Sequence, residues 1–209
     1  MSAGDSRLYA PATERNRAPI LAVLEPLLHE GSVLEVASGT GEHITWFATQ
    51  MLALRFLPSD PDPAHRASIA QWTQALGVTN VAPPLDLDAT ATAWTLPAAE
   101  LARLRAVLCI NMIHIAPWQA TQGLMRNAAA VLPPGGVLYL YGPFRRGGNH
   151  TAPSNAAFHE SLRARDAAWG VRDLEAVQAQ ALAHGLTTEQ VTEMPANNLS
   201  LVLRRTGAP

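Results

Sequence analysis

Short apolar runs alternate with amphipathic segments along most of the chain. The apolar runs predict buried strands at residues 32–38, 53–58, 78–87, 106–111 and 137–141, of which the third is interrupted near Pro83 and Pro84. The amphipathic segments predict helices at residues 42–50, 64–75, 96–104 and 117–132. Because these strands and helices alternate, the order favours a doubly wound α/β fold whose mostly parallel sheet is covered by helices on both faces.

The pattern changes after Tyr141. A loop at 142–153 is expected first, and helices at 155–169 and 174–184 follow. Two late strands, 187–193 and 199–204, are joined by turn residues and predict an antiparallel hairpin that brings the sheet to seven strands. A further helix is expected at residues 13–29, with Pro19 marking its start and Pro26 a kink.

We expect a single domain over residues 1–209, because no linker-like segment separates two parts of the sequence. Residues 1–30 would form an N-terminal helical segment or lid, and residues 31–145 a ligand-binding core. Residues 146–209 would supply the remaining helices and the closing hairpin.

The amino-acid composition argues against several classes of protein. With 48% hydrophobic and 15% charged residues, the chain is not expected to be intrinsically disordered. The formal net charge of −2 gives no general reason to bind a nucleic-acid backbone. All 15 basic residues are arginine, which excludes chemistry that requires a lysine amine.

The single cysteine, Cys109, excludes an internal disulfide and a cysteine-cluster zinc site. The histidines are scattered, so no metal is expected. The N-terminus lacks a basic start and an apolar run, and no apolar stretch approaches the roughly 20 residues that span a bilayer. We therefore expect a cytoplasmic protein without a membrane association.

The first apolar run ends in a glycine pair. Gly39 and Gly41 allow a sharp turn and a close approach of the backbone to a ligand such as a nucleotide. A dinucleotide site would have a third glycine three residues later, where this chain has Ile44. The Tyr-x-x-x-Lys pair of many nicotinamide enzymes is also impossible without lysine. A nicotinamide-dependent oxidoreductase is therefore disfavoured.

An acidic side chain follows the second predicted strand. Asp60 lies about 20 residues beyond Gly41, the position at which a carboxylate can accept hydrogen bonds from both ribose hydroxyls of a nucleoside. Asp60 could also act as a turn or helix-capping residue, since its neighbours are Pro, Ser and Asp.

The segment Glu35-x-Ala37-x-Gly39-x-Gly41 resembles the first motif of class I S-adenosylmethionine-dependent methyltransferases, with alanine in place of the first glycine. The resemblance implies that Glu35 supports the methionine amino end and the glycine loop. At the later strand ends, it implies cofactor contacts whose residues are Asp86 and Leu87 at the adenine, and Asn111 and Met112 at the methionine part.

Nearly the whole chain further resembles the methyltransferase-like family called domain of unknown function 938. The segments that carry this resemblance are 9–17, 37–43, 141–144, 154–158, 169–173 and 194–198. The resemblance implies the methyltransferase fold and an S-adenosylmethionine site, but it implies no particular substrate.

Candidate acceptor residues lie where loops should cover the strand ends. His114 is the candidate general base, since an ordinary histidine has a pKa near 6.5. Arg145 and Arg146 beside Gly147-Gly148 suggest a mobile lid over an anionic substrate, or else a solvated loop. The candidate substrate-binding residues are Tyr9, Arg15, Asn16, Trp118, Arg145, His150 and Asn155.

The leading interpretation is methyl transfer to O, N or S of a small molecule. A non-catalytic S-adenosylmethionine-binding or scaffold protein is an alternative, because fold does not determine function. An RNA or protein methyltransferase is less favoured. Enzymes that methylate base amino groups have two prolines and an aromatic residue after the fourth strand's Asn or Asp, whereas this chain continues Asn111-Met112-Ile113-His114. The acceptor, the oligomeric state and the need for a base stay open.

Overall fold

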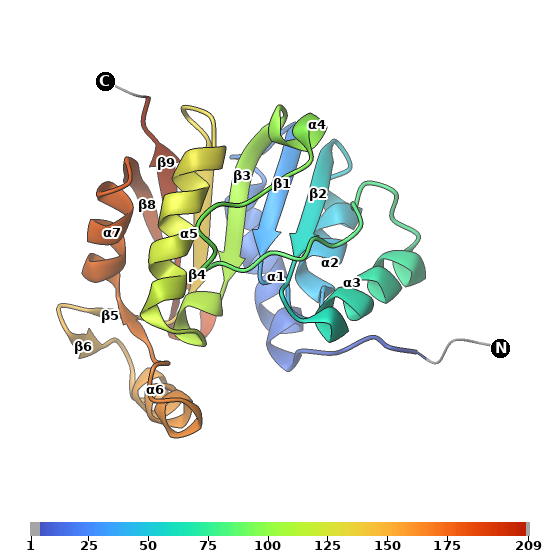
Figure 1. Cartoon of the computed structure of the whole chain (residues 1–209). Coiled ribbons are helices and arrows are strands. Elements are labelled where there is room, and N and C mark those ends of the chain that lie inside the picture. Colours follow the sequence, from blue (N-terminus) through green and yellow to red (C-terminus); the bar gives the residue numbers. More distant parts are fainter. Residues whose placement is uncertain (1–4, 208–209) are drawn as a thin grey trace. The chain divides into compact units, whose positions relative to one another are not determined.

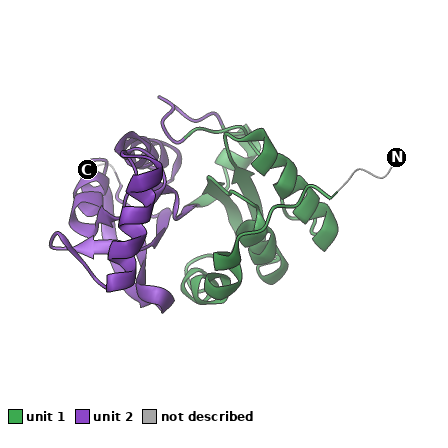
Figure 2. Cartoon of the chain, turned by 90° about the horizontal axis from the view of Figure 1, so that it is seen from below, with its two compact units in different colours: residues 1–88, 96–106 green, residues 89–95, 107–209 purple. Residues whose placement is uncertain are grey.

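The computed structural model describes residues 5–207 and divides them into two compact units (Figure 2). The first unit comprises the described residues up to Asp88 together with residues 96–106. The second comprises residues 89–95 and the described residues from Val107 onward. The division passes through a strand, so the two units share one structural element.

The first unit contains a parallel strand pair and its helices (Figure 1). Strands β1 and β2 pair in parallel, with Val33 opposite Phe56 and Glu35 opposite Pro58. All six β1 residues are buried, as expected for a strand covered on both faces. The elements are α1 (Pro11–Leu24), β1 (Gly31–Val36), α2 (Glu42–Gln50), β2 (Leu54–Ser59), α3 (Pro63–Leu76) and α4 (Ala98–Leu101).

Helix α3 shows why the sequence folds this way locally. The Asp62 side chain caps its N-terminus by accepting a hydrogen bond from the backbone N–H of Ala64, and Pro63 occupies the first turn. Gly77 ends the helix in a left-handed conformation. These signals fix the start of α3 immediately after the end of β2, where the candidate ligand-binding carboxylate lies.

The second unit contains the later strands and an antiparallel hairpin (Figure 1). Strands β4 and β9 pair antiparallel with Leu140 opposite Leu201, and β8 and β9 form the closing hairpin. Its elements are most of β3 (Leu104–Ile110), the short helix η1 (Met112–His114), α5 (Trp118–Val131), β4 (Val137–Gly142), β5 (Phe144–Arg146), β6 (Asn149–His150), α6 (Pro153–Arg165), β7 (Arg172–Asp173), α7 (Leu174–Leu182), β8 (Leu186–Met194), η2 (Pro195–Asn197) and β9 (Asn198–Arg205).

The strand order confirms the predicted fold class. Hydrogen-bonded neighbours run β2-β1-β3 and then β3-β4-β9-β8, so a mostly parallel sheet ends in an antiparallel hairpin. A small second sheet has the order β6-β5-β7. Gly147 and Gly148, both at positive φ, make the two-residue turn between β5 and β6.

Some predicted elements differ from the structure. Residues 78–87 do not form a regular strand; two isolated parallel bridges, Phe56 with Val81 and Ser59 with Leu85, occupy the place of the seventh strand. The helix expected at 96–104 is only the single turn α4. Helix α1 begins at Pro11 and contains Pro19 in its interior, so the predicted start at Pro19 was wrong. The loop expected at 142–153 contains β5 and β6.

Candidate functional site

The turn after β1 is built from three residues in the left-handed region. Ala37, Gly39 and Gly41 have φ values of 57°, 55° and 87°. A Cβ at Gly41 would lie 2.8 Å from the Cα of Ile69 in α3, so this glycine permits the close approach of two helices. A Cβ at Gly39 would meet nothing within 4 Å among the described residues. Gly39 is therefore the glycine whose backbone faces open space.

Asp60 joins the end of β2 to this glycine loop. Its Oδ2 accepts a hydrogen bond from the backbone N–H of Gly39 at 2.9 Å. Its Oδ1 accepts one from the backbone N–H of Asp62 at 2.9 Å and lies 3.1 Å from Nδ1 of His65. The residue is only 4% exposed. These contacts hold the carboxylate in a fixed orientation. Because each carboxylate oxygen can accept more than one hydrogen bond, the group also retains capacity for a ligand.

Glu35, near the end of β1, carries a buried carboxyl group. It is 1% exposed, and its Oε2 has no hydrogen-bond partner within residues 5–207. Burial raises the pKa of Glu35 to about 8, and the nearby charge of Asp60 contributes in the same direction. A cationic group placed beside Glu35 would favour its ionised form and would supply the missing partner.

Asp86 lies on the surface of the first unit, whereas Leu87 is buried. The Asp86 carboxylate lies 3.2 Å from the Arg66 guanidinium, which also donates a hydrogen bond to the backbone carbonyl of Asp60 at 2.8 Å. Arg66 therefore links the Asp86 carboxylate to the backbone of Asp60, a role that sequence reasoning missed. Its position one turn into α3, beside an acidic loop, was the available signal.

The N-terminal segment is fastened to the glycine loop. The backbone N–H of Ala10 donates to the Glu42 carboxylate, and that of Leu8 donates to Oγ of Ser68 at 2.8 Å. Ser68 in turn donates to the backbone carbonyl of Thr40 at 2.7 Å. Glu42 and Ser68 were not among the predicted site residues, although Glu42 falls within the family-like segment 37–43. These contacts fix the N-terminal segment against the loop.

The three predicted substrate residues of this segment have different environments. Tyr9 is 61% exposed and its ring meets that of Trp72 edge to face at 5.1 Å. Arg15 is exposed. Asn16 is buried, and its Oδ1 lies 2.6 Å from Nε2 of His43. Burial lowers the pKa of His43 to about 4, with the charge of Arg17 adding to the effect, so the ring is neutral at pH 7.

The chain turns sharply at the end of β3, in the second unit. Asn111 has a φ of 63°, and its backbone N–H donates to the carbonyl of Tyr141 at 2.8 Å. A Cβ at Gly142 would lie 3.3 Å from Oδ1 of Asn111 and 2.5 Å from Nε2 of His114. Met112, which follows Asn111 in the sequence, is buried. Gly142 therefore allows β4 to lie directly against the turn that carries the candidate residues.

His114 differs from the ordinary histidine expected of a general base. It is fully buried, its ring meets that of Phe144 at 5.0 Å, and its Nδ1 accepts a hydrogen bond from the backbone N–H of Arg172 at 3.3 Å. Burial, followed by the charge of Arg172, lowers the pKa of His114 to about 3. The expectation of a pKa near 6.5 is corrected: the ring is neutral and a weak base.

Two predicted substrate residues line a pocket of about 360 Å³ in the second unit, namely Trp118 and Arg145. Arg145 forms an ion pair with Asp173 at 2.7 Å. His150, opposite Arg145 in the small sheet, has its ring 5.1 Å from that of His159. The structure thus gathers part of the predicted acceptor set around β5 and α6.

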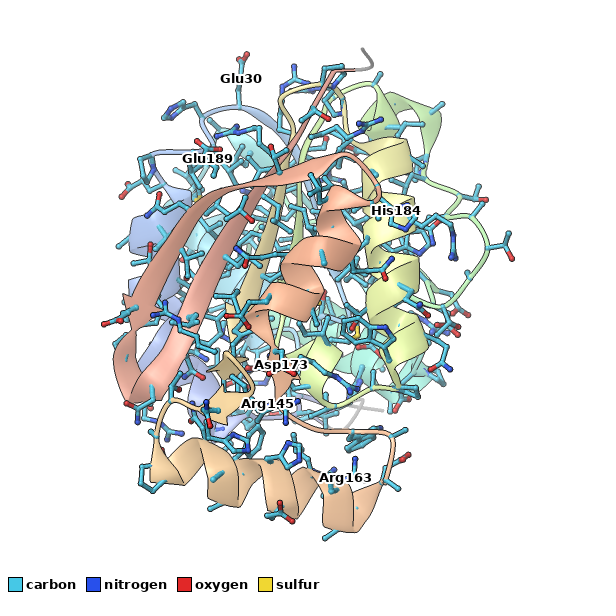
Figure 3. All side chains as sticks on the ribbon, turned by 90° about the vertical axis from the view of Figure 1, so that its left-hand side faces the viewer. Glu30, Arg145, Arg163, Asp173, His184 and Glu189 are labelled. Atoms are coloured by element: carbon cyan, nitrogen blue, oxygen red, sulfur yellow. The ribbon has the colours of Figure 1, made fainter. Side chains whose placement is uncertain are left out.

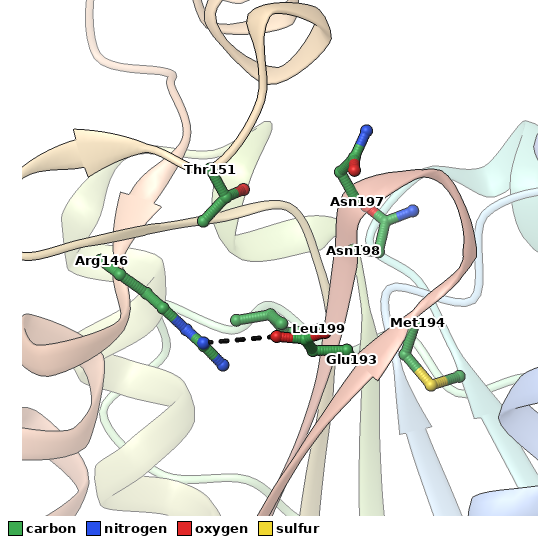
Figure 4. A pocket seen from close by; sticks show the side chains of 7 residues that line it. All are labelled: Arg146, Thr151, Glu193, Met194, Asn197, Asn198 and Leu199. Atoms are coloured by element: carbon green, nitrogen blue, oxygen red, sulfur yellow. Dashed lines mark ion pairs between the residues drawn. The ribbon is translucent and has the colours of Figure 1, made fainter.

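Asn155 has a different position. Its Nδ2 donates to the carbonyl of Asn197 at 2.8 Å and to Oγ1 of Thr151 at 3.0 Å, so it fastens α6 to η2. Thr151 and Asn197 line another pocket, of about 200 Å³, in which Arg146 and Glu193 form an ion pair at 3.6 Å (Figure 4). Asn155 therefore supports the wall of this pocket.

A match to a protein-family model shows the family to which this chain belongs. The model of the family described as "Protein of unknown function (DUF938)" matches residues 7–205. The chain belongs to the DUF938 family. This membership confirms the resemblance seen in the sequence.

Solved structures of methyltransferases share the fold of this DUF938 protein. A putative O-methyltransferase from Nostoc punctiforme matches with a TM-score of 0.79 at 14% identity, over 93% of this chain and 57% of that chain. The mitomycin 7-O-methyltransferase MmcR matches with a TM-score of 0.78 at 14% identity, over 93% and 54%. Human N-acetylserotonin methyltransferase, solved in complex with S-adenosylmethionine, matches with a TM-score of 0.76 at 11% identity, over 94% and 53%.

These similarities show the methyltransferase fold. This chain spans little more than half the length of the three structures. In the part of the chain that the structure describes, no helix has the length and apolarity to cross a membrane. Over the same residues, no group of three or more His, Cys, Asp or Glu is placed to hold a metal ion.

Proposed function

We propose that this DUF938 protein is an S-adenosylmethionine-dependent methyltransferase that transfers a methyl group to O, N or S of a small-molecule acceptor. The observation that carries the proposal is the hydrogen bond from Gly39 to the Asp60 carboxylate at the ends of β1 and β2. It places an acidic group next to a glycine whose Cβ position is open, and it does so in a fold shared with S-adenosylmethionine-dependent enzymes.

The residues of the first unit fit the cofactor. The unpartnered Oε2 of buried Glu35 suits the cofactor's ammonium group, because a cation there would lower the raised pKa of Glu35. Gly39 leaves room for the ligand, and Asp60 has lone pairs for the ribose hydroxyls. Ala37, Gly41, Asp86 and Leu87 would shape the rest of this half.

In the second unit, Asn111 and Met112 are proposed to contact the methionine part of the cofactor. When bound, the cofactor supplies an electrophilic methyl group on a sulfonium. The protein's own contribution is to hold the acceptor close to that carbon and in line with the bond that breaks. Such positioning lowers the barrier without a proton transfer when the acceptor atom is already deprotonated.

His114 is proposed as a positioning residue. Its burial and low pKa disfavour proton removal from an acceptor, whereas its Nδ1 and its carbonyl hold Arg172 and Gly170 by their backbone N–H groups. The buried ring therefore holds the start of β7, and the His114 backbone carbonyl holds the loop before it. A histidine that only positions neighbouring residues does not need a ring nitrogen that is accessible to the acceptor.

The proposal of a small-molecule acceptor is supported by the names of the structural neighbours. Mitomycin and N-acetylserotonin are the small molecules in the names of two of them. The net charge of −2 and the balance of 15 basic against 17 acidic residues give no general attraction to nucleic acid.

A protein that binds S-adenosylmethionine without catalysis is the second candidate. The full burial of His114 favours it, because that residue was the candidate base. This candidate shares the cofactor site with the first one and differs only in turnover.

Calorimetric titration with S-adenosylmethionine, S-adenosylhomocysteine and NAD tests the proposal. We expect the two sulfur nucleosides to bind and NAD not to bind. Asp60→Ala should weaken binding at least about tenfold, since hydrogen bonds to a charged group contribute about 1.5–3 kcal/mol. Glu30→Gln, which removes an exposed carboxylate, is the matched control and should bind as the wild type does.

Failure of both sulfur nucleosides to bind would overturn the proposal. Binding that is unchanged in Asp60→Ala would remove this carboxylate from the site. Once binding is established, transfer of a labelled methyl group to a panel of small acceptors distinguishes the enzyme from the non-catalytic candidate.

A further inference from the structure

The pocket of about 360 Å³ in the second unit has an unusual concentration of arginine side chains. Arg145 of β5, Arg163 of α6 and Arg172 of β7 all line it, together with Asp173. In Figure 3, Arg145 and Asp173 lie beside each other, and Arg163 lies on the helix below them. The volume falls within the range of about 300–1,000 Å³ that is usual for small-molecule sites.

The charges that line this pocket are not balanced. Asp173 is the carboxylate among the lining residues, and it is already bound to Arg145 at 2.7 Å. Two buried atoms of this ion pair, Nε of Arg145 and Oδ1 of Asp173, have no hydrogen-bond partner among the described residues. Burial lowers the pKa of Arg172, and the charges of Arg145 and Arg163 lower it further. Arg145 and Arg163 therefore each repel the Arg172 guanidinium, and an anion bound beside Arg172 would offset that repulsion.

Arg172 is held in place before any ligand arrives. Its Nε donates to the carbonyl of Ile113 at 2.9 Å, and its guanidinium also donates to the carbonyls of Ala116 and Ala168 at 2.6 and 2.8 Å. The ring of Trp118 lies 5.7 Å from the guanidinium carbon. A guanidinium fixed by three backbone carbonyls loses little side-chain entropy on binding, which favours affinity.

Two tryptophans give the pocket a hydrophobic component. Trp118 and Trp169 both line it, with Val171 and Ala176 completing an apolar surface beside the arginines. Indole rings are large apolar surfaces that pack well against planar ligands. The combination of fixed cations and indole rings suits a molecule with a planar apolar body and an anionic end.

We infer that this pocket binds the carboxylate end of a small aromatic acid and that this acid is the methyl acceptor. Its role as acceptor rests on the proposed function, whereas anion binding does not. The pocket wall supports that role: Gly170 donates a backbone hydrogen bond to the His114 carbonyl at 2.9 Å. That contact joins the wall to η1, which begins at Met112, a residue proposed to contact the cofactor.

Benzoate and its neutral analogue benzamide are the probes. Each is titrated into the full chain without cofactor, and the tryptophan indole N–H resonances are followed by NMR. We expect benzoate to shift these resonances and to bind at least about tenfold more tightly than benzamide, because a charge-assisted hydrogen bond is worth about 1.5–3 kcal/mol.

Arg163→Gln is the principal variant, since Arg163 is exposed and its replacement should leave the fold intact. It should weaken benzoate binding about tenfold. Arg146→Gln is the matched control: it removes the same charge from the residue next to Arg145, but Arg146 lines the other pocket. Its benzoate affinity should equal that of the wild type.

Equal affinity for benzoate and benzamide would overturn the inference, as would an unchanged benzoate affinity in Arg163→Gln. The outcome is independent of the cofactor test, because no cofactor is present in the titration. Benzoate binding without S-adenosylhomocysteine binding would keep the anion pocket and reject the methyltransferase. Binding of both ligands, without methylation of any aromatic acid in a panel of acceptors, would reject the assignment of the acceptor.

Discussion

The backbone N–H of Gly39 donates a hydrogen bond to Oδ2 of Asp60, with 2.9 Å between the two atoms. This contact joins the ends of two neighbouring parallel strands through a side chain. The Asp60 carboxylate thus fixes the backbone of the glycine loop, and it is also the group that we propose to bind the cofactor. Effects on the loop and on ligand binding should be separable by substitutions at the two glycines.

Gly41→Ala should mainly lower the free energy of unfolding, whereas Gly39→Ala should mainly weaken ligand binding. Gly41→Ala places a Cβ 2.8 Å from the backbone of Ile69, so we expect it to lower the free energy of unfolding by about 3 kcal/mol. Gly39→Ala meets no neighbour and should lose only about 1 kcal/mol from backbone strain. Its methyl group should nevertheless weaken S-adenosylhomocysteine binding at least about tenfold. Urea unfolding and calorimetry measure the two effects, and equal stability losses would contradict this interpretation.

Glu35 should make stability fall as the pH rises. Its pKa is about 8 in the folded chain, above the ordinary value of 4.5, so the folded state retains a proton that the unfolded state releases. Stability is therefore greatest below pH 4.5 with respect to this group and is lost between pH 4.5 and about 8, by up to about 1.4 kcal/mol per pH unit.

Glu35→Gln removes this dependence. We expect the free energy of unfolding of the variant, relative to the wild type, to increase from pH 5 to pH 8 in urea titrations. Glu30→Gln, at an exposed position, should show no such trend. A constant difference between Glu35→Gln and the wild type across this range would show that Glu35 is ionised in the folded protein.

His43 and His114 should remain neutral in mildly acid solution. Their pKa values are lowered to about 4 and about 3, mainly by burial. NMR titration of the histidine ring protons should show no protonation of either residue between pH 8 and pH 5. Because the unfolded chain takes up these protons near pH 6.5, stability should fall as the pH drops from 6.5 toward 4. A midpoint near 6.5 for His114 would restore it as a candidate base.

The hydrogen bond between Asn16 and His43 should anchor the N-terminal helix. Asn16→Ala leaves Nε2 of the half-buried His43 without its partner at 2.6 Å, so we expect a loss of about 1–3 kcal/mol in the free energy of unfolding. Arg15→Ala, at the neighbouring exposed position, should change it by less than about 0.5 kcal/mol. Equal losses in the two variants would mean that α1 is held by its apolar residues alone.

Local signals were enough to predict most of the sheet and several helices. Helix α2 was expected at residues 42–50 and is found at those residues, because Gly41 marks its start and its apolar positions recur at helical spacing. The apolar run at 106–111 corresponds to β3. The strand predicted at residues 78–87 was expected to be interrupted near Pro83 and Pro84, which cannot donate hydrogen bonds, and the structure has only two isolated bridges there, one on each side of these prolines.

The environment of the candidate residues was less predictable. Sequence spacing indicated Asp60 beyond the second strand, but it could not show that the Gly39 N–H would bind its carboxylate. The burial of His114 depends on the close approach of Gly142 and on Phe144, which are distant in sequence. The Gly147-Gly148 pair was a usable signal for the β5–β6 turn, since two residues at positive φ are typical of tight hairpins.

The extended segment beside β2 has a consequence for self-association. Its backbone bridges β2 at Phe56–Val81 and at Ser59–Leu85 and so occupies hydrogen-bonding positions at the sheet edge. Between the bridges, Pro83 and Pro84 have no N–H to offer to an approaching chain. An open strand edge invites intermolecular β pairing, and prolines there oppose it. We therefore expect this edge segment to oppose intermolecular β pairing beside β2.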